Sequence, residues 1–233
     1  MVRHATNLII DAFPTESRKR LASRLERINL RVTQVLCEPG SKVEFVYFPT
    51  TCVLSFLGVA ESGQAVETAT IGREGAFGLV SGMLSGEAYP RCVVQYDGYA
   101  NRILATEIKK EFDRSPMVRR VVLSYVEALL VQVQQSVLCG ALHPIQARLA
   151  RFLLTLQNRA GTNTFALTQE YLANILGVNR STLTQAAGAL QSNGVINYRR
   201  GHVSIRDRSG LERASCECYR VLRDQFERLQ LRR

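Results

Sequence analysis

The sequence predicts an α+β fold made of an antiparallel β-rich front part, one long helix, and a helical back part with a small hairpin. Three observations support this class. Residues 31–106 contain short β-branched or aromatic segments separated by Gly and Pro. From Pro116 to about Gly140 the apolar residues recur at helical spacing. Residues 168–205 then contain two short amphipathic stretches and two strand-like segments around an Arg-Arg-Gly turn.

The front part is expected to be an antiparallel barrel or sandwich. Its strand-like segments recur about every ten residues, which is typical of all-β domains. Dipeptides that favour turns lie between the segments, namely Pro39-Gly40, Ser62-Gly63 and Asp97-Gly98.

The long helix, expected over about residues 116–140, carries an apolar seam in which steps of four and three residues alternate. Further apolar residues flank this seam, so the helix must bury a second surface besides that of its own domain. We expect that surface to be the same helix of a twin subunit, although a helix buried inside a monomer fits the same pattern. The predicted dimer-interface residues are Val118, Val122, Tyr125, Leu129, Gln132 and Ser136.

No segment approaches the ~20 apolar residues that a membrane-spanning helix needs. The longest apolar runs are 52–60 and 121–133, and the second contains Glu127 and Gln132. The N-terminal apolar run is too short for a signal peptide. We therefore expect a cytoplasmic protein without a membrane partner.

The pair His143-Pro144 marks the expected boundary between two domains, residues 1–142 and 143–233, because a residue before proline is pushed out of the helical region. The charge changes near the same point. Residues 146–233 contain 14 arginines and 6 acidic residues, whereas the front part is almost balanced in a chain of net charge +10. This asymmetry predicts that the back part binds a polyanion, nucleic acid before membrane. An extra amphipathic helix is expected from Ser209 onward.

The segment 168–194 has the pattern of a helix-turn-helix. Thr168 and Asn179 are favourable N-caps for two short helices. Ala173, Gly177 and Leu183 have the spacing that lets the two helices cross closely, turn sharply and fill the wedge between them.

A basic hairpin follows this pattern. Arg199, Arg200 and His202 lie at its turn, and a basic hairpin beside a helix-turn-helix is placed to hold a phosphate backbone. Together with the local charge, the two motifs predict a winged helix-turn-helix that binds double-stranded DNA.

Several motifs together resemble the Crp/Fnr family of bacterial transcription regulators. They are YFP at 47–49, G-x-E-G-x-x-G at 72–78, the long helix, and LTQEYLANILGVNRSTLTQAAGALQSNGVI with RRG after it. The resemblance covers nearly the whole chain. It implies a cyclic-nucleotide-binding-like β-roll, a dimerisation helix and a C-terminal winged helix-turn-helix. It also implies a homodimer on a near-palindromic DNA site, with RNA polymerase as a further partner.

In that geometry the second helix of the motif enters the major groove. Arg180 is suited to a bidentate contact with guanine and Gln185 to a contact with adenine. Many family members carry Glu where Ser181 stands and Arg where Gln185 stands, so the family's usual half-site does not transfer. The resemblance places Asn179, Arg180, Ser181, Thr184 and Gln185 at bases or flanking phosphates, and Thr168, Thr182 and Arg199 at phosphates.

The phosphate-binding cassette of the cyclic-nucleotide members is degenerate here. Gly78-Leu79 stands where those members have Gly-Glu, so the carboxylate that accepts from the ribose hydroxyl is missing. Arg91 and Cys92 are the candidates for the Arg and small residue that follow. We expect no tight binding of cyclic AMP, and the identity of any small-molecule effector stays open.

No cofactor or metal is predicted. The six cysteines are scattered, without the N-terminal cluster of an iron–sulfur sensor, and His143 is expected to start a helix rather than bind haem. Cys216 and Cys218 form a C-x-C pair without a second pair or a neighbouring His. A thiol switch using Cys37, Cys52, Cys92 or Cys139 remains open.

An enzyme is not expected, because the sequence contains no G-x-S-x-G, phosphate loop or metal-ligand spacing. The alternative that stays open is a β-roll that binds a small molecule and whose basic half docks on a protein or a membrane.

Overall fold

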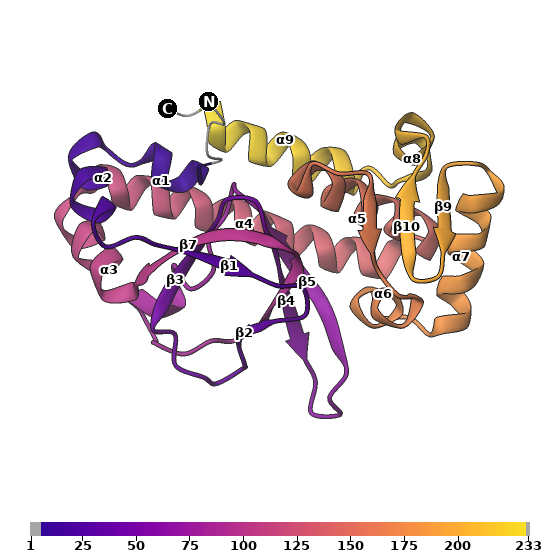
Figure 1. Ribbon diagram of the computed structural model, residues 1–233, viewed down its shortest axis with the longest axis horizontal. Coiled ribbons are helices and arrows are strands. Elements are labelled where there is room, and N and C mark those ends of the chain that lie inside the picture. The colour runs from indigo at the N-terminus through magenta and orange to yellow at the C-terminus, as the bar shows by residue number, and fades with distance from the viewer. Residues whose placement is uncertain (1–5, 232–233) are drawn as a thin grey trace.

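The computed structural model describes residues 6–231 of the chain. A β-rich half and a helical half are joined by the long helix α4 (Figure 1). The front half contains α1 (Leu8–Ala12), α2 (Thr15–Ala22), β1 (Glu26–Leu30), β2 (Val35–Cys37), β3 (Phe45–Pro49), β4 (Val53–Val59), β5 (Ala65–Ile71), the 3-10 turn η1 (Ser81–Met83), β6 (Arg91–Tyr96), β7 (Gly98–Leu104) and α3 (Ala105–Arg114). The remainder contains α4 (Pro116–Leu142), α5 (Ile145–Ala160), β8 (Thr164–Ala166), α6 (Gln169–Leu176), α7 (Arg180–Ser192), β9 (Ile196–Arg199), β10 (His202–Ile205), α8 (Arg208–Ala214) and α9 (Cys218–Leu231).

Two antiparallel sheets build the front half. In one sheet β7 lies between β1 and β3, and the other has the order β2-β6-β4-β5. Side chains that alternate inward along these strands, such as Phe48 and Leu54, are fully buried between the sheets and α4. The predicted α+β class, with an antiparallel front part and a long helix, is confirmed.

The helix α4 begins where Ser115 accepts a hydrogen bond from the backbone N–H of Val118 and Pro116 occupies the first turn. It ends at His143, whose extended backbone precedes Pro144. Two polar side chains fix the helix to the front half: the Tyr125 hydroxyl donates to the Ala76 carbonyl (2.7 Å) and the Gln132 amide donates to the Thr70 carbonyl (2.9 Å).

These contacts correct the predicted dimer interface. Val118, Val122, Tyr125 and Gln132 are buried inside their own chain, so they are not available to a partner. Leu129 packs at the edge of the same core and Ser136 lines a cavity between the two halves. Both sides of α4 are apolar, and heptad spacing alone does not say which side faces the front half.

The opposite side of α4 carries the exposed apolar residues. Leu123, Leu130 and Val137 recur every seven residues and are 59%, 56% and 69% exposed. By length and composition this helix is also able to cross a membrane, contrary to the sequence expectation. The front half and α9 cover the rest of α4, so this exposed strip of Leu123, Leu130 and Val137 is a surface without a partner among the described residues.

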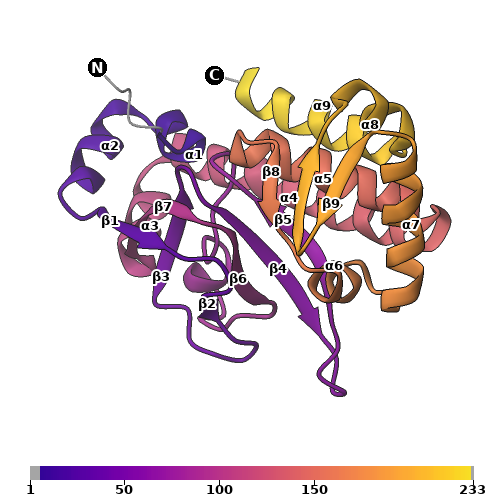
Figure 2. The same ribbon diagram turned by 45° about the vertical axis from the view of Figure 1, so that its right-hand side comes forward.

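The back half packs on α5, which ends at Gly161 with φ +68°. Its core is continuous with the front half, because Val53 and Leu57 of β4 and Val93 of β6 join the same apolar cluster as Leu153 of α5. The segment from Ser209 onward, expected to be one extra helix, forms two, α8 and α9, which are separated at Ser215. α9 packs along α4 and α5 (Figures 1 and 2). Residues 232–233 of that prediction lie outside the described residues.

Candidate nucleic-acid interface

Two capped helices joined by a glycine turn form the helix-turn-helix. Thr168 caps α6 by accepting from the Tyr171 N–H (3.1 Å), and Asn179 caps α7 by accepting from the Thr182 N–H (2.8 Å). Gly177 between them has φ +64° and ψ +42°, and its N–H reaches carbonyls of the last turn of α6. This left-handed conformation is the reason that the turn requires glycine.

Burial orients α7. Leu183, Ala187 and Leu190 are buried against α5 and α6, as the sequence predicts. Arg180, Ser181, Thr184 and Gln185 are exposed on the opposite side, and Thr182 is half-buried. The first two turns of α7 therefore present a guanidinium, two hydroxyl groups and an amide outward near the positive end of the helix dipole.

Thr184 also contacts the first helix of the motif. Its hydroxyl lies 2.9 Å from Gln169 Oε1 and 2.8 Å from the Arg180 carbonyl. Gln169 therefore belongs to the same polar surface, although it is not among the residues predicted from the sequence. Its position directly after the N-cap Thr168 is the signal that could have identified it.

The wing is the predicted hairpin. β9 and β10 pair antiparallel with Arg199 opposite His202, and β8 adds a third strand. Arg200 (φ +50°) and Gly201 (φ +76°) make the tight turn, which projects Arg200 outward. A methyl group at Gly201 would lie 3.6 Å from the Thr168 side chain, so the tip of the wing adjoins the start of α6.

Tyr198 of β9 joins the wing to the helix-turn-helix. Its hydroxyl donates to the Leu167 carbonyl (2.7 Å), and its N–H donates to the Gln191 side chain (2.6 Å). Burial raises the pKa of Tyr198 to about 12, and the positive charge of Arg180 opposes this rise. Arg180 therefore lies close to the wing as well as at the start of α7.

The arginines of the back half differ in whether they form an ion pair. Arg159, Arg208 and Arg213 pair with Glu74 (2.6 Å), Glu212 (3.1 Å) and Asp207 (3.6 Å), away from the helix-turn-helix. Within residues 6–231, no carboxylate forms an ion pair with Arg180, Arg199 or Arg200. Arg148, Arg151, Arg206 and Arg220 also form no ion pair among the described residues, but Arg180, Arg199 and Arg200 stand at the exposed start of α7 and on the wing, where a phosphate backbone would compete with no internal carboxylate. The fold thus brings the predicted DNA-contact residues of α6, α7 and the wing onto one exposed surface, with His202 and Thr168 at its edge.

The four predicted effector-pocket residues, Gly78-Leu79 and Arg91-Cys92, each have internal packing or pairing partners. Gly78 (φ +78°) packs so closely that an added methyl carbon would lie 2.6 Å from the Phe45 carbonyl oxygen. Leu79 and Cys92 are buried in two different apolar clusters. Arg91 is bound to Glu38, with Nε 2.7 Å from Oε2.

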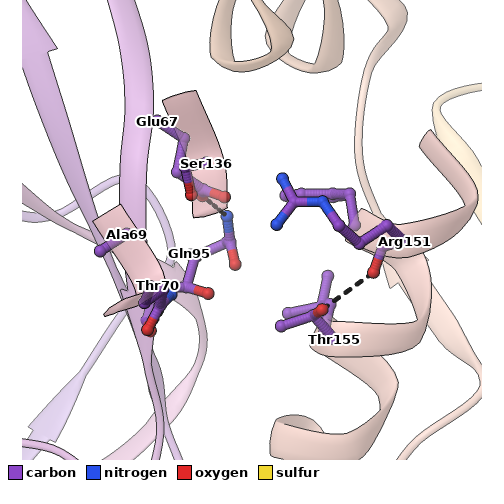
Figure 3. Close-up of a pocket in the computed structure, with 10 residues that line it drawn as sticks. Glu67, Ala69, Thr70, Gln95, Ser136, Arg151 and Thr155 are labelled. Carbon is purple, nitrogen blue, oxygen red and sulfur yellow. Dashed lines mark hydrogen bonds between the residues drawn. The ribbon is translucent and has the colours of Figure 1, made fainter. Parts of the chain in front are cut away.

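A polar cavity lies instead between the front half and α5 (Figure 3). The Ser55 hydroxyl and the Gln95 amide each donate to Glu67 Oε2 at 2.7 Å, and burial raises the pKa of this carboxyl. Arg151 points across the cavity toward Glu67 and Gln95. The free volume of the cavity, about 10 Å³, has room for about one water molecule. The lining residues are Glu67, Ala69, Thr70, Gln95, Gln132, Ser136, Arg151, Phe152, Thr155 and Leu156.

The fold brings together four possible metal ligands that the spacing of residues in the sequence does not reveal. Cys139 and His143 at the end of α4 meet Cys216 and Cys218 at the start of α9, with all four ligand atoms within 4.8 Å of one another. His143 ends α4 instead of starting α5. Spacing between neighbours in the chain does not reveal this cluster, because its two pairs come from opposite ends of the back half.

The back half has the fold of a winged helix-turn-helix domain, a class of domain that binds DNA. Residues 147–214 match the family model described as the Crp-like helix-turn-helix domain. The chain therefore carries a Crp-like helix-turn-helix domain, and its overall fold is that of Crp/Fnr-type transcription regulators. This confirms the resemblance predicted from the motifs.

Solved structures of such regulators cover most of the chain. FixK2 from Bradyrhizobium japonicum is 18% identical, with TM-score 0.70, covering 82% of this chain and 98% of that chain. A Crp/Fnr-family regulator from Eubacterium rectale is 18% identical, with TM-score 0.71 and coverage of 88% and 95%. The c-di-GMP-responsive regulator CLP from Xanthomonas campestris is 14% identical, with TM-score 0.67 and coverage of 82% and 99%. No curated protein matched the sequence.

Proposed function

We propose that this protein is a transcription regulator that binds a specific, near-palindromic DNA site as a homodimer and is not an enzyme. The observation that carries the proposal is that Arg180, Arg199 and Arg200 are exposed at the start of α7 and on the wing and form no ion pair among the described residues. In a winged helix-turn-helix, that surface meets the major groove and the adjoining phosphates.

Each part of the surface has its own task. Arg180 and Gln185 reach base edges, Arg180 with the geometry that suits guanine. Ser181 and Thr184 contact bases or phosphates beside them. Thr168, Thr182, Arg199, Arg200 and His202 hold the backbone on either side of the groove.

Binding-site selection from random DNA, followed by titration at several salt concentrations, tests the proposal. Arg180→Ala should weaken binding to the selected site by about 1–3 kcal/mol and relax the preference at one base pair. Arg199→Ala should weaken binding to all sequences alike and reduce the salt slope by about 1. Arg213→Ala is the matched control, because Arg213 is exposed in the same half but paired with Asp207. Failure to select any site, or equal effects of all three substitutions, would refute the proposal.

The homodimer is proposed to form through the exposed strip of α4 in place of the buried seam. Leu123, Leu130 and Val137 repeat at heptad spacing, which suits knobs-into-holes packing against a second copy of α4. Leu130→Asp should convert the dimer to a monomer in analytical ultracentrifugation. Leu84→Asp, at a residue 80% exposed in the front half, should leave the mass unchanged. A monomeric wild-type protein would contradict this interface.

The front half is proposed not to bind cyclic AMP. Leu79 is buried where the cassette needs a carboxylate, and Arg91 is neutralised by Glu38. The cavity beside α4 has space for about one water molecule, far less than a nucleotide. Calorimetry with cyclic AMP should show no heat of binding, and micromolar affinity would overturn this part of the proposal.

A further inference from the structure

Four side chains with metal-binding atoms converge where α4 ends and α9 begins. Cys139 and His143 are one helical turn apart at the end of α4, and Cys216 and Cys218 flank the residue just before α9. The three thiols are buried and form an apolar cluster of their own, separate from the main cores. From this geometry we propose that Cys139, His143, Cys216 and Cys218 bind one zinc ion in a tetrahedral Cys₃His site.

The spacing of the ligand atoms fits a single ion. Cys139 Sγ lies 3.5 Å from Cys216 Sγ, and His143 Nδ1 lies 3.4 Å from Cys218 Sγ. Zn–S bonds of about 2.3 Å place two thiolates of a tetrahedral site about 3.8 Å apart. All four atoms lie within 4.8 Å of one another, so shifts of about 1 Å or less bring them to zinc distances. Three soft thiolates and one imidazole are a ligand set that selects zinc among the common divalent ions.

A second layer of contacts already orients the imidazole. His143 Nε2 lies 3.1 Å from Glu217 Oε1, which leaves Nδ1 directed at the cluster. A carboxylate on the outer nitrogen of a ligating histidine fixes the tautomer and makes the inner nitrogen a better ligand. The Gln135 amide donates to Cys218 Sγ at 3.0 Å, a contact that also suits a thiolate.

Positive side chains near the cluster would balance the negative charge of the zinc–ligand complex. Three thiolates, a neutral imidazole and Zn²⁺ carry a net charge of −1, because binding releases the three thiol protons to solvent. Arg148 and Arg151 of α5 lie close enough to Cys139 to interact with it electrostatically. Neither guanidinium forms an ion pair with a carboxylate in residues 6–231, so positive charge is available to balance the site. The four protein ligands leave no position open for a substrate, which is the arrangement of a structural zinc site.

Metal content of the full-length protein, purified under reducing conditions without chelator, tests the site. Inductively coupled plasma mass spectrometry should find about one zinc ion per chain. Cys218→Ser and His143→Gln should each lower the zinc content or affinity at least about tenfold. Cys37→Ser is the matched control, because Cys37 is a buried thiol of the front half and should keep its zinc. Retention of zinc by both Cys218→Ser and His143→Gln would overturn the proposal.

A second measurement needs no variant. Titration of the reduced, metal-free wild-type protein with Co²⁺ should saturate at one ion per chain and give the intense visible absorption of tetrahedral thiolate-bound cobalt. Excess Zn²⁺ should abolish that absorption. Absence of the absorption would refute the site, as would a Cys139–Cys216 disulfide in protein isolated without oxygen. Both outcomes are independent of DNA binding.

Discussion

Two glycine substitutions in the helix-turn-helix, one at its turn and one inside α7, should change the free energy of unfolding in opposite directions. Gly177 has φ +64°, and an added methyl group would meet only Val66 at an ordinary contact distance of 3.4 Å. The penalty of Gly177→Ala is therefore that of a left-handed backbone, about 1–2 kcal/mol. Gly188 lies inside α7 and is exposed, and a methyl carbon added there would have no heavy atom within 4 Å. Gly188→Ala should stabilise the protein by up to about 1 kcal/mol.

The two variants should differ by roughly 1–3 kcal/mol in free energy of unfolding. For a chain of this length, 1 kcal/mol shifts the melting temperature by about 2–4 °C. Thermal unfolding of both variants beside wild type, followed by circular dichroism, measures the difference. A Gly177→Ala protein that melts with or above Gly188→Ala would refute the assignment of the turn to a left-handed glycine. Both substitutions replace hydrogen by methyl, so side-chain size does not account for a difference in sign.

Two carboxyls of the front half, Glu111 and Glu67, lead to further predictions with opposite pH dependence. Arg20 donates two hydrogen bonds to Glu111 and lowers the pKa of this carboxyl, so the stabilisation is present above the carboxyl's ordinary pKa and is lost as pH falls. In urea titrations, Glu111→Gln should lower the free energy of unfolding by about 1.5–3 kcal/mol at neutral pH and by less in acid. Glu16→Gln on the same surface is the control and should cost under about 0.5 kcal/mol. Burial raises the pKa of Glu67, so between the ordinary carboxyl pKa and the raised one the folded state holds a proton that the unfolded chain releases. The free energy of unfolding should therefore fall as pH rises through this range, and Glu67→Gln should remove the fall. An unchanged stability–pH profile of Glu67→Gln would contradict the burial argument.

The helix-turn-helix could be predicted because its determinants are local. Thr168, Asn179 and Gly177 act on backbone groups within three or four residues, so caps and turn are visible in the sequence. The wing turn at Arg200-Gly201 is equally local. The contact of Thr184 with Gln169 was not predictable in this way, because it depends on how two helices cross.

The buried side of α4 could not be predicted for a related reason. Two apolar strips share the helix, one containing Val122 and Tyr125 and the other Leu123 and Leu130, and both satisfy a heptad pattern. What distinguishes them is the pair of hydrogen bonds from Tyr125 and Gln132 to carbonyls of the front half. Those acceptors belong to distant segments, so only the folded chain identifies the strip that remains exposed.

The proposed zinc ligands would also affect how the two halves of the chain are held together. One pair, Cys139 and His143, precedes the helix-turn-helix, and the other, Cys216 and Cys218, follows it. A metal that joins them closes the whole DNA-binding domain into a loop of chain, and closing a long loop removes more entropy from the unfolded state than closing a short one. The same bond fastens α9 to the end of the helix that carries the exposed strip. Metal occupancy would thereby limit how far the DNA-binding surface turns relative to the proposed dimer axis, which sets the half-site spacing that a dimer accepts.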